Sequence, residues 1–262
     1  MIPINDIKAW SNIAPWINDE QIEQDLIISR SLVELFSDEY LIQNLAFRGG
    51  TAIHKLFLIP QQRYSEDIDL VQINSGPIRK MMDNIREKLS FLGEPVVKQK
   101  KNNNTLVFKF LSSGIPAVPL RLKIEINCRE HFIVMGLREV DFNIDTRWFK
   151  GNCKIRTYHP EELLGTKLRA VYQRKKGRDL YDIYKALTTI QLNISELIRC
   201  YREYMTFSAD HIPTRKQFIL NMEEKITDPA FLGDLTALLR PDELYNPQSA
   251  WELVKTEIIE KL

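Results

Sequence analysis

Two aspartates stand two residues apart in the segment Asp67-Ile68-Asp69-Leu70. Val71 continues the apolar part of this segment, which is typical of a strand. Successive side chains of a strand point to opposite faces, so both carboxylates would share one face while Ile68 and Leu70 enter the core. Such a pair can hold Mg²⁺ ions roughly 4 Å apart for phosphoryl or nucleotidyl transfer. An ordinary polar strand edge is the alternative interpretation.

A glycine turn lies upstream of these aspartates, at Gly49-Gly50-Thr51. Glycine lets the backbone turn tightly, and we expect a short helix to follow over residues 52–58. The first N–H groups of that helix and the Thr51 hydroxyl would face a triphosphate. Each motif alone is weak evidence, and an ordinary turn also fits the glycines. Together, the turn and the aspartates favour a nucleotide site.

The composition limits the class of protein. The 262 residues are 44% hydrophobic and 10% aromatic, enough for one large domain or two modest ones, and we expect two. Lys and Arg number 36 against 35 Asp and Glu, so nucleic acid could bind only at a local patch. Cys128, Cys153 and Cys200 form no Cys-x-x-Cys motif and fit a reducing cytoplasm. With no apolar run of membrane-spanning length and no secretory leader, we expect a soluble, cytoplasmic protein without a membrane partner.

Hydrophobic periodicity predicts a mixed first part and a helical second part. The expected strands cover residues 45–48, 66–73 and 120–127, with others inside 94–111 and 131–157. The expected helices cover residues 17–37, 78–89, 160–173, 179–187, 193–207, 214–226, 229–239 and 248–261. We expect the passage between domains at residues 145–153, which divides the chain into domains 1–152 and 153–262.

A third acidic residue could join the two aspartates. Residues 120–127 alternate between apolar and polar side chains, and Glu125 is on the polar side. If this strand pairs beside the strand of Asp67 and Asp69, Glu125 faces the same site. A strand with one solvated face explains the alternation equally well.

Polar residues of the helical part add further candidates. Lys167 interrupts the apolar stripe of its expected helix, where an ammonium is costly without an anion; a snorkelling lysine and a phosphate-binding lysine both fit. Residues 174–178 then form a dense positive run. Asp179 as an N-cap, with Asp182 three residues later, resembles a capping box, and the spacing alone favours that structural role.

The ordered set of these motifs resembles the AbiEii/MenT-type nucleotidyltransferase toxin family over roughly residues 20–190. The motifs are Gly49-Gly50-Thr51, Arg63-x-Ser65-x-Asp67-Ile68-Asp69-Leu70, Lys123-Ile124-Glu125-Ile126, Lys167-Leu168-x-Ala170 and Arg178-Asp179-Leu180-Tyr181-Asp182. The resemblance implies an α/β (α+β) nucleotidyltransferase fold of the polymerase-beta superfamily, with a mixed sheet and flanking helices. A C-terminal helical-bundle domain would follow.

The resemblance also implies the roles of the site residues. The catalytic set is Asp67, Asp69, Glu125, Lys167 and Asp182. Asp67, Asp69 and Glu125 are the Mg²⁺ ligands, and Glu125 assists or acts as the base. The nucleotide-binding set is Gly49, Gly50, Thr51, Arg63, Ser65 and Lys167. A hydroxyl would attack the α-phosphate of a nucleoside triphosphate in line, pyrophosphate would leave, and Asp182 would position Lys167 or the acceptor. Whether Asp179 acts or only caps a helix is left open.

The expected partners follow from the same resemblance. They are a nucleoside triphosphate, an RNA acceptor such as a tRNA end, and the cognate antitoxin of a toxin–antitoxin or phage-defence system in a bacterial cytoplasm. The basic clusters at residues 98–101 and 174–178 would contact the RNA backbone. A small-molecule or protein acceptor is the nearest alternative. A catalytically silent nucleotide- or RNA-binding module is another, although such a module would not need the complete acidic set.

Overall fold

The structure, a computed structural model, describes residues 2–100, 102–209 and 211–262. Its strands are β1 (Leu45–Arg48), β2 (Asp67–Gln72), β3 (Val96–Lys100), β4 (Asn103–Leu111), β5 (Pro119–Asn127), β6 (Leu137–Asp145) and β7 (Lys150–Tyr158). Its α-helices are α1 (Ile4–Trp10), α2 (Asp19–Phe36), α3 (Glu39–Asn44), α4 (Gly49–Leu56), α5 (Arg79–Lys88), α6 (Pro160–Gln173), α7 (Gly177–Thr189), α8 (Ile194–Ser208), α9 (Arg215–Lys225), α10 (Pro229–Gly233) and α11 (Pro247–Glu257). Two 3₁₀ turns, η1 (Ser90–Leu92) and η2 (Ile259–Lys261), complete the elements.

The seven strands form one mixed sheet in the order β3-β4-β5-β2-β1-β7-β6. β2 pairs with β5 in parallel and with β1 antiparallel, and β1 pairs with β7 in parallel. The outer pairs, β3 with β4, β4 with β5 and β6 with β7, are antiparallel. The strand that carries the two aspartates therefore lies near the middle of the sheet, with a paired strand on each side.

Alternation along β2 and β5 separates the core from the site. Ile68, Leu70 and Ile124 are buried with at most 1% of their surface exposed, while Asp67 and Asp69 between them are only partly covered. The period of two follows from strand geometry, so burying one set of side chains presents the other set on the opposite face. The core thereby fixes the direction of the acidic side chains.

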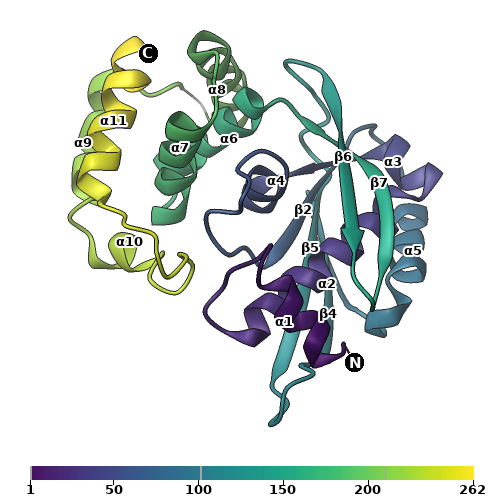
Figure 1. Ribbon diagram of the computed structural model, residues 1–262. Helices are drawn as coiled ribbons and strands as arrows, with labels where there is room; N and C mark the ends of the chain where they lie inside the picture. Colours follow the sequence, from purple (N-terminus) through teal and green to yellow (C-terminus); the bar gives the residue numbers. More distant parts are fainter. Residues whose placement is uncertain (1, 101, 210) are drawn as a thin grey trace.

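Helices flank the sheet and continue as a group towards the C-terminus (Figure 1). α4 lies between the central strands and α6 and α7, so it separates the sheet from the helical part of the chain (Figure 1). α6 begins at Pro160, whose missing N–H costs nothing in a first helical turn, and Glu161 follows it there. The predicted mixed sheet with flanking helices, followed by C-terminal helices, is confirmed.

The predicted passage between domains at residues 145–153 is wrong. Asp145 pairs with Lys150 at the end of the β6–β7 hairpin, and β7 continues in the sheet to Tyr158. The turn-forming residues of this segment join the two strands of a hairpin. In the sequence they could equally join two domains, and the pairing of β7 with β1 shows that β7 still belongs to the sheet. The change from strand to helix comes at residue 159. The division into domains 1–152 and 153–262 stays a proposal.

Other boundaries also differ from the expectation. The helix predicted over residues 52–58 is α4 (Gly49–Leu56), so the glycines lie in its first turn, and the helix predicted over residues 248–261 ends at Glu257. The helix predicted over residues 229–239 ends at Gly233 in α10. The basic cluster predicted at residues 98–101 lies largely within a strand, because Lys98 and Lys100 belong to β3 and pair across to β4. Lys101, the last residue of that basic cluster, lies outside the described residues. None of the helices described here has the length and apolar character needed to cross a membrane.

Candidate functional site

The pairing of β2 with β5 brings the three predicted carboxylates to one face. Asp69 is directly opposite Glu125 in the parallel register, and Asp67 is opposite Lys123. The Lys123 ammonium lies 2.7 Å from an Asp67 oxygen and 3.2 Å from a Glu125 oxygen. The sheet register thus places Asp67, Asp69 and Glu125 together, as predicted, with one cation among them.

Asp69 lies in the most unfavourable electrostatic position of this group. Burial raises the pKa of its carboxyl group, Arg48 opposes that shift, and the charges of Asp67 and Glu125 add to it. Bringing these carboxylates together is unfavourable without a cation between them, and carboxylate oxygens are the donors that Mg²⁺ prefers. The chemistry of the donor set therefore fits Mg²⁺.

The geometry of the same side chains is less complete. Across the described ranges, no three His, Cys, Asp or Glu side chains converge as a group that could hold a metal ion. Lys123 accounts for part of this, because its ion pairs draw Asp67 and Glu125 to an ammonium. Mg²⁺ at Asp67, Asp69 and Glu125 stays a prediction.

The glycine turn makes room for two charged groups. Gly49 has φ of +83°, and a Cβ there would overlap the Asp69 carboxylate, with Asp69 Cγ 2.9 Å away. A Cβ at Gly50 would overlap the Arg63 guanidinium and lie 3.3 Å from an Asp182 oxygen. Both positions need glycine for a close approach, and Gly49 also needs it for its backbone conformation.

Thr51 does not have the role predicted for its hydroxyl. The side chain is buried, and Oγ1 donates to the Asp67 carbonyl oxygen at 2.5 Å and lies 2.7 Å from Ser65 Oγ. These bonds tie the start of α4 to the start of β2. Thr51 therefore holds the backbone of Asp67 in place. Ser65, in contrast, lines the cleft described below.

Asp182 is fully buried and is surrounded by cationic and N–H groups. It accepts hydrogen bonds from Arg63 Nε at 2.6 Å and Nη2 at 2.8 Å, and its Oδ2 lies 2.9 Å from Lys167 Nζ. His54 Nε2 lies 2.8 Å from Oδ1. Burial alone would raise the pKa of Asp182, but Arg63, Lys167 and His54 hold it well below its usual range. Asp182 therefore positions Lys167, as expected, and also anchors Arg63.

Lys167 is a buried ion-pair partner and not a snorkelling lysine. Only 8% of its side chain is exposed, and Nζ lies 2.8 Å from Asp179 Oδ1. Burial lowers the pKa of Lys167, but Asp179 and Asp182 outweigh that effect and raise it. Arg174 binds the same Asp179 carboxylate through two nitrogens at 2.7 and 2.9 Å.

Asp179 does not cap α7, the role that its spacing alone favoured and that the sequence left open. The N-cap of α7 is Lys176, which leaves Asp179 inside the first turn, and its carboxylate receives Lys167 and Arg174 instead of backbone N–H groups. The basic run that precedes it decides this outcome, since a buried carboxylate favours full positive charges over amides. Asp179 thus supports the cations of the site.

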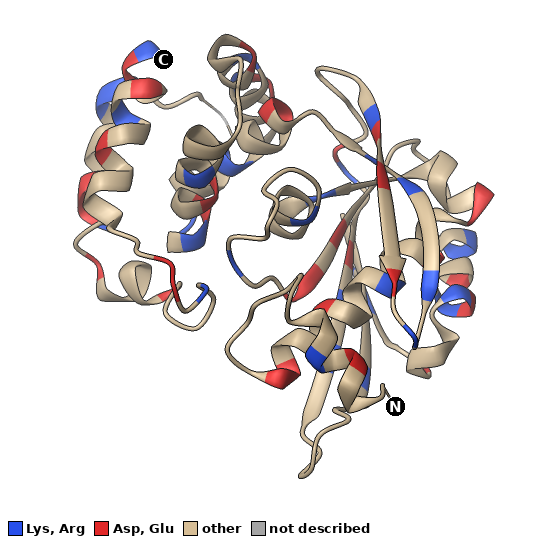
Figure 2. Ribbon diagram, viewed as in Figure 1, with Lys and Arg blue, Asp and Glu red and all other residues tan. Residues whose placement is uncertain are grey.

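These groups meet in a cleft of about 250 Å³ between the sheet and the α6–α7 segment. Its lining residues are Gly50, Arg63, Ser65, Glu66, Asp67, Asp69, Lys123, Glu125, Lys167, Arg174, Lys176 and Arg178. Acidic positions of the central strands and basic positions of α6 and α7 are visible in Figure 2. A cleft with carboxylates on one wall and cations on the other suits a metal-bound polyphosphate.

The amino-acid sequence matches the model of a known protein family. The model for "Nucleotidyl transferase AbiEii toxin, Type IV TA system" matches residues 30–255. The chain belongs to this family of nucleotidyltransferase toxins. The predicted family is thereby confirmed, and the AbiEii match extends well beyond the motifs into the C-terminal helices. The comparison with curated proteins found no match.

Two solved structures are similar to this AbiEii family member. MenT4, a nucleotidyltransferase toxin from Mycobacterium tuberculosis, is 15% identical with a TM-score of 0.68; the match covers 100% of this chain and 91% of MenT4. A crystal structure described as a nucleotidyltransferase from H. pylori is 14% identical with a TM-score of 0.54, and the match covers 94% and 96% of the two chains. At this level of identity, the similarity shows the shared fold.

Several cleft residues had no predicted part in the chemistry. Lys123, Glu66 and His54 are in or against the site, although the prediction gave them no role. Lys123 could have been found from its place two residues before Glu125, on the same polar strand face. His54 carries no such signal, because only the packing of α4 against α7 brings it to Asp182.

Replacing Gly49 with alanine tests the close approach to Asp69. We expect Gly49→Ala to lower the melting temperature and abolish nucleotidyl transfer, because the new Cβ displaces Asp69 and the positive φ adds about 1–2 kcal/mol of strain. Gly93→Ala is the matched control, since Gly93 has φ of +82° with no atom near its Cβ position. If both variants lose the same stability and keep activity, the Asp69 contact is unimportant.

The buried His54 predicts a pH dependence of stability. Burial, together with the charges of Arg63 and Lys167, lowers the pKa of His54 to about 4 despite the attraction of Asp182. The unfolded chain therefore takes up a proton near pH 6.5 while the folded protein does not. The free energy of unfolding should fall by up to about 1.4 kcal/mol per pH unit from this residue between pH 6.5 and pH 4.

Denaturant titrations of His54→Gln at several pH values measure this contribution. The variant should lose stability less steeply than the wild type over that pH range. His211→Gln replaces an exposed histidine and should leave the slope unchanged. Parallel wild-type and His54→Gln curves would show that His54 takes up its proton over the same pH range in the folded and the unfolded protein.

Proposed function

We propose that the protein transfers a nucleoside monophosphate from a nucleoside triphosphate to the terminal hydroxyl of an RNA, with a tRNA end as the preferred acceptor. The proposal rests on the cleft in which the carboxylates of the sheet face the cations of the helical part. The carboxylates are Asp67, Asp69 and Glu125, and the cations are Lys167, Arg174, Lys176 and Arg178. Family membership supports the nucleotidyl transfer itself. The acceptor, the metal and the roles of individual residues go beyond family membership and belong to the proposal.

In the proposed mechanism, cations of the helical part bind the triphosphate. Lys167 lies in the cleft with its charge maintained by Asp179 and Asp182, and Arg174 lies beside it. Both would neutralise the charge that develops on the leaving pyrophosphate. Arg63 is held by Asp182 through two nitrogens, and its third nitrogen donates to the Tyr64 carbonyl oxygen. Its main contribution is therefore to keep the Asp182 carboxylate in place.

The carboxylates would serve the attacking hydroxyl. Asp67 and Asp69, with Glu125, would hold Mg²⁺, which when bound makes a hydroxyl more acidic and neutralises phosphate oxygens. Glu125 can also accept the proton of the acceptor hydroxyl as that oxygen attacks the α-phosphorus. Lys123 pairs with Asp67 and Glu125 and compensates their charge in the protein without nucleotide. The attack is in line, with pyrophosphate leaving on the opposite side.

A small molecule is the second candidate for the acceptor, because acidic partners neutralise most of the positive charges of residues 174–178. Arg174 binds Asp179, Lys175 lies 3.1 Å from Asp228, and Arg178 binds Asp234 through two nitrogens. Such pairing reduces the field available to a long RNA backbone. Incubation with each labelled triphosphate, Mg²⁺, and either total RNA or small hydroxyl compounds distinguishes the two acceptor classes.

The wider setting is also part of the proposal. The family is one of type IV toxin–antitoxin systems, so we propose a cognate antitoxin as the biological partner and the bacterial cytoplasm as the location. Both triphosphates and tRNA are present there. Co-expression with the product of a neighbouring gene should relieve growth arrest caused by this chain.

Removal of either aspartate tests the prediction that Asp67 and Asp69 hold Mg²⁺. We expect Asp67→Ala and Asp69→Ala each to abolish transfer, measured as incorporation of a labelled nucleotide. The melting temperature should stay at or above the wild-type value, because Asp69 lies against like charges. Asp141→Ala removes an exposed aspartate of β6 and should leave activity unchanged. Substantial transfer by either site variant would contradict the carboxylate mechanism, whereas a wild type that transfers nothing would support a binding role.

Two neighbouring lysines test the RNA path. Lys176 lines the cleft, whereas Lys175 is paired with Glu224 and Asp228 outside it, and the two side chains are about half exposed. Alanine is preferable to glutamate here, because a reversed charge would repel the acidic partners and unfold the turn. Lys176→Ala should reduce the slope of log affinity for RNA against log salt by about 0.7 to 0.9, while Lys175→Ala leaves it unchanged. Equal slopes for all three proteins would argue against RNA beside Lys176.

A further inference from the structure

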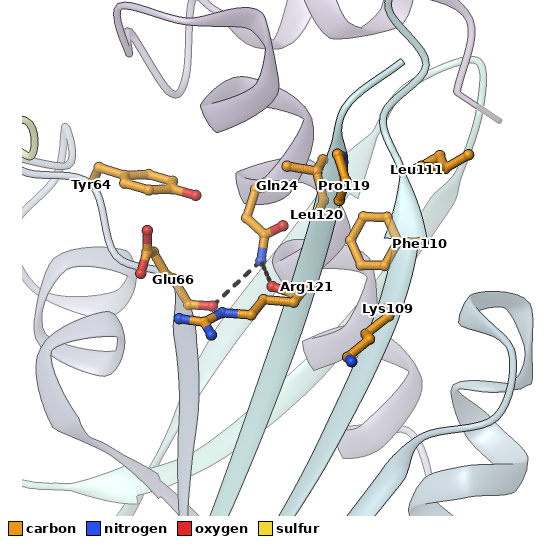
Figure 3. Close-up of a pocket in the computed structure, with 9 residues that line it drawn as sticks. All are labelled: Gln24, Tyr64, Glu66, Lys109, Phe110, Leu111, Pro119, Leu120 and Arg121. Carbon is orange, nitrogen blue, oxygen red and sulfur yellow. Dashed lines mark hydrogen bonds between the residues drawn. The ribbon is translucent and has the colours of Figure 1, made fainter.

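A second cavity opens beside the cleft, where β2 and β5 begin (Figure 3). It has a volume of about 580 Å³, and its apolar and aromatic walls are formed by Tyr64, Phe110, Leu111, Pro119 and Leu120. Glu66 lines both this cavity and the cleft, and it directly precedes Asp67 in the chain. The two hollows therefore meet at Glu66, beside the start of β2.

Gln24 supplies a polar group in the wall. Its Nε2 donates to the Arg121 carbonyl oxygen at 2.7 Å and to the Glu66 carbonyl oxygen at 3.4 Å (Figure 3). These two acceptors fix the orientation of the amide, because the opposite orientation would place oxygen against both carbonyls. Gln24 is 98% buried, and its Oε1 has no hydrogen-bond partner among the described residues. A buried acceptor without a partner is a position where the N–H of a ligand would be stabilising.

The rim of the cavity is basic. Lys109 of β4 and Arg121 of β5 are opposite each other in the antiparallel register, and both side chains are exposed. Leu111 extends the apolar wall outward and is 66% exposed. An aromatic slot with cations at its mouth has the chemistry that holds an unstacked nucleobase and its phosphate.

We propose that this cavity holds the base of the terminal nucleotide of the acceptor RNA, stacked against Phe110 and Tyr64. The inference rests on the proposed transfer to RNA and names the subsite that such an acceptor occupies. Lys109 and Arg121 contact the adjoining phosphates, and Glu66 marks the passage of the terminal ribose towards Asp67. The sugar hydroxyl then reaches the carboxylates while its base stays in the cavity.

The positions of the cations indicate that the cavity holds the acceptor base and not the base of the incoming triphosphate. Lys167, Arg174 and Lys176 line the cleft from the helical part of the chain, whereas the cavity lies where β4 and β5 meet the loop before β2. Pyrophosphate bound to those cations leaves towards the helices. In-line transfer requires the attacking hydroxyl to come from the side opposite the pyrophosphate, and the proposal assigns that side to Glu66 and the cavity.

Two variants change the cavity in opposite ways. Phe110→Ala removes a stacking wall from a partly exposed position, and Leu120→Trp fills the space. Both should raise the KM for acceptor RNA by roughly tenfold or more, as expected for the loss of one stacked base, while the KM for the triphosphate stays unchanged. Phe207→Ala is the matched control, since Phe207 is a half-exposed aromatic of α8 that packs on Phe132 outside the cavity.

The outcomes of the kinetic test differ in meaning. A higher KM for the triphosphate with an unchanged KM for RNA would assign the cavity to the incoming base and overturn the inference. Unchanged values for both substrates in both cavity variants would show that no base enters. An effect of Phe207→Ala equal to that of Phe110→Ala would place the stacking surface elsewhere and overturn it as well.

A crosslinking experiment separates this inference from the proposed function. A short RNA ending in photoreactive 8-azidoadenosine is irradiated with the wild-type protein, and the crosslinked peptides are mapped by mass spectrometry. We expect crosslinks to the peptides of Tyr64 and Phe110, lost in Leu120→Trp. Their absence overturns the inference even where RNA is modified. If the crosslinks form but the wild type transfers nucleotide to no RNA, the cavity binds a terminal base while the RNA-transfer proposal, and with it the acceptor role of the cavity, fails.

Discussion

The buried carboxylate of Asp182 is the interaction on which the arrangement of the site depends. It joins α7 to Arg63 in the loop before β2, to His54 of α4 and to Lys167 of α6. A fully buried charge is tolerated only when its partners satisfy it, and removing one partner of such a group typically costs about 3–5 kcal/mol. Asp182 therefore links α4, α6, α7 and the loop before β2, and it fixes the positions of Arg63 and Lys167 in the cleft.

The glycine turn is the second constraint, because it lets charged groups approach the backbone. Gly49 leaves space for Asp69, and Gly50 leaves space for the Arg63 guanidinium and for Asp182. The turn therefore connects the acidic wall of the cleft with the buried cationic network. The nucleotide site and the fold share these residues, so the same close contacts that stabilise the domain also align its reactive groups.

The sequence by itself determined the local elements and the acidic face. The period of two placed Asp67 and Asp69 on one face of β2 and Glu125 on the polar face of β5, and α2 (Asp19–Phe36) forms within the predicted range 17–37. Only the pairing of β5 with β2 brings Glu125 to the two aspartates. These features depend on neighbours along the chain, so their patterns can be recognised without partners. The set of motifs also indicated the family, and with it brought Lys167 into the site, where spacing alone had left a snorkelling role equally open.

Only the tertiary structure decided how the polar residues are used. Thr51 binds the Asp67 carbonyl, and Asp179 binds Lys167 and Arg174 where a cap was expected. Residues 145–153 form a hairpin because β7 pairs with β1, about a hundred residues earlier in the chain. In each case the sequence allows two local roles of similar energy. Burial selects between them, because a charge or a backbone edge removed from water must meet a partner that is distant in the chain.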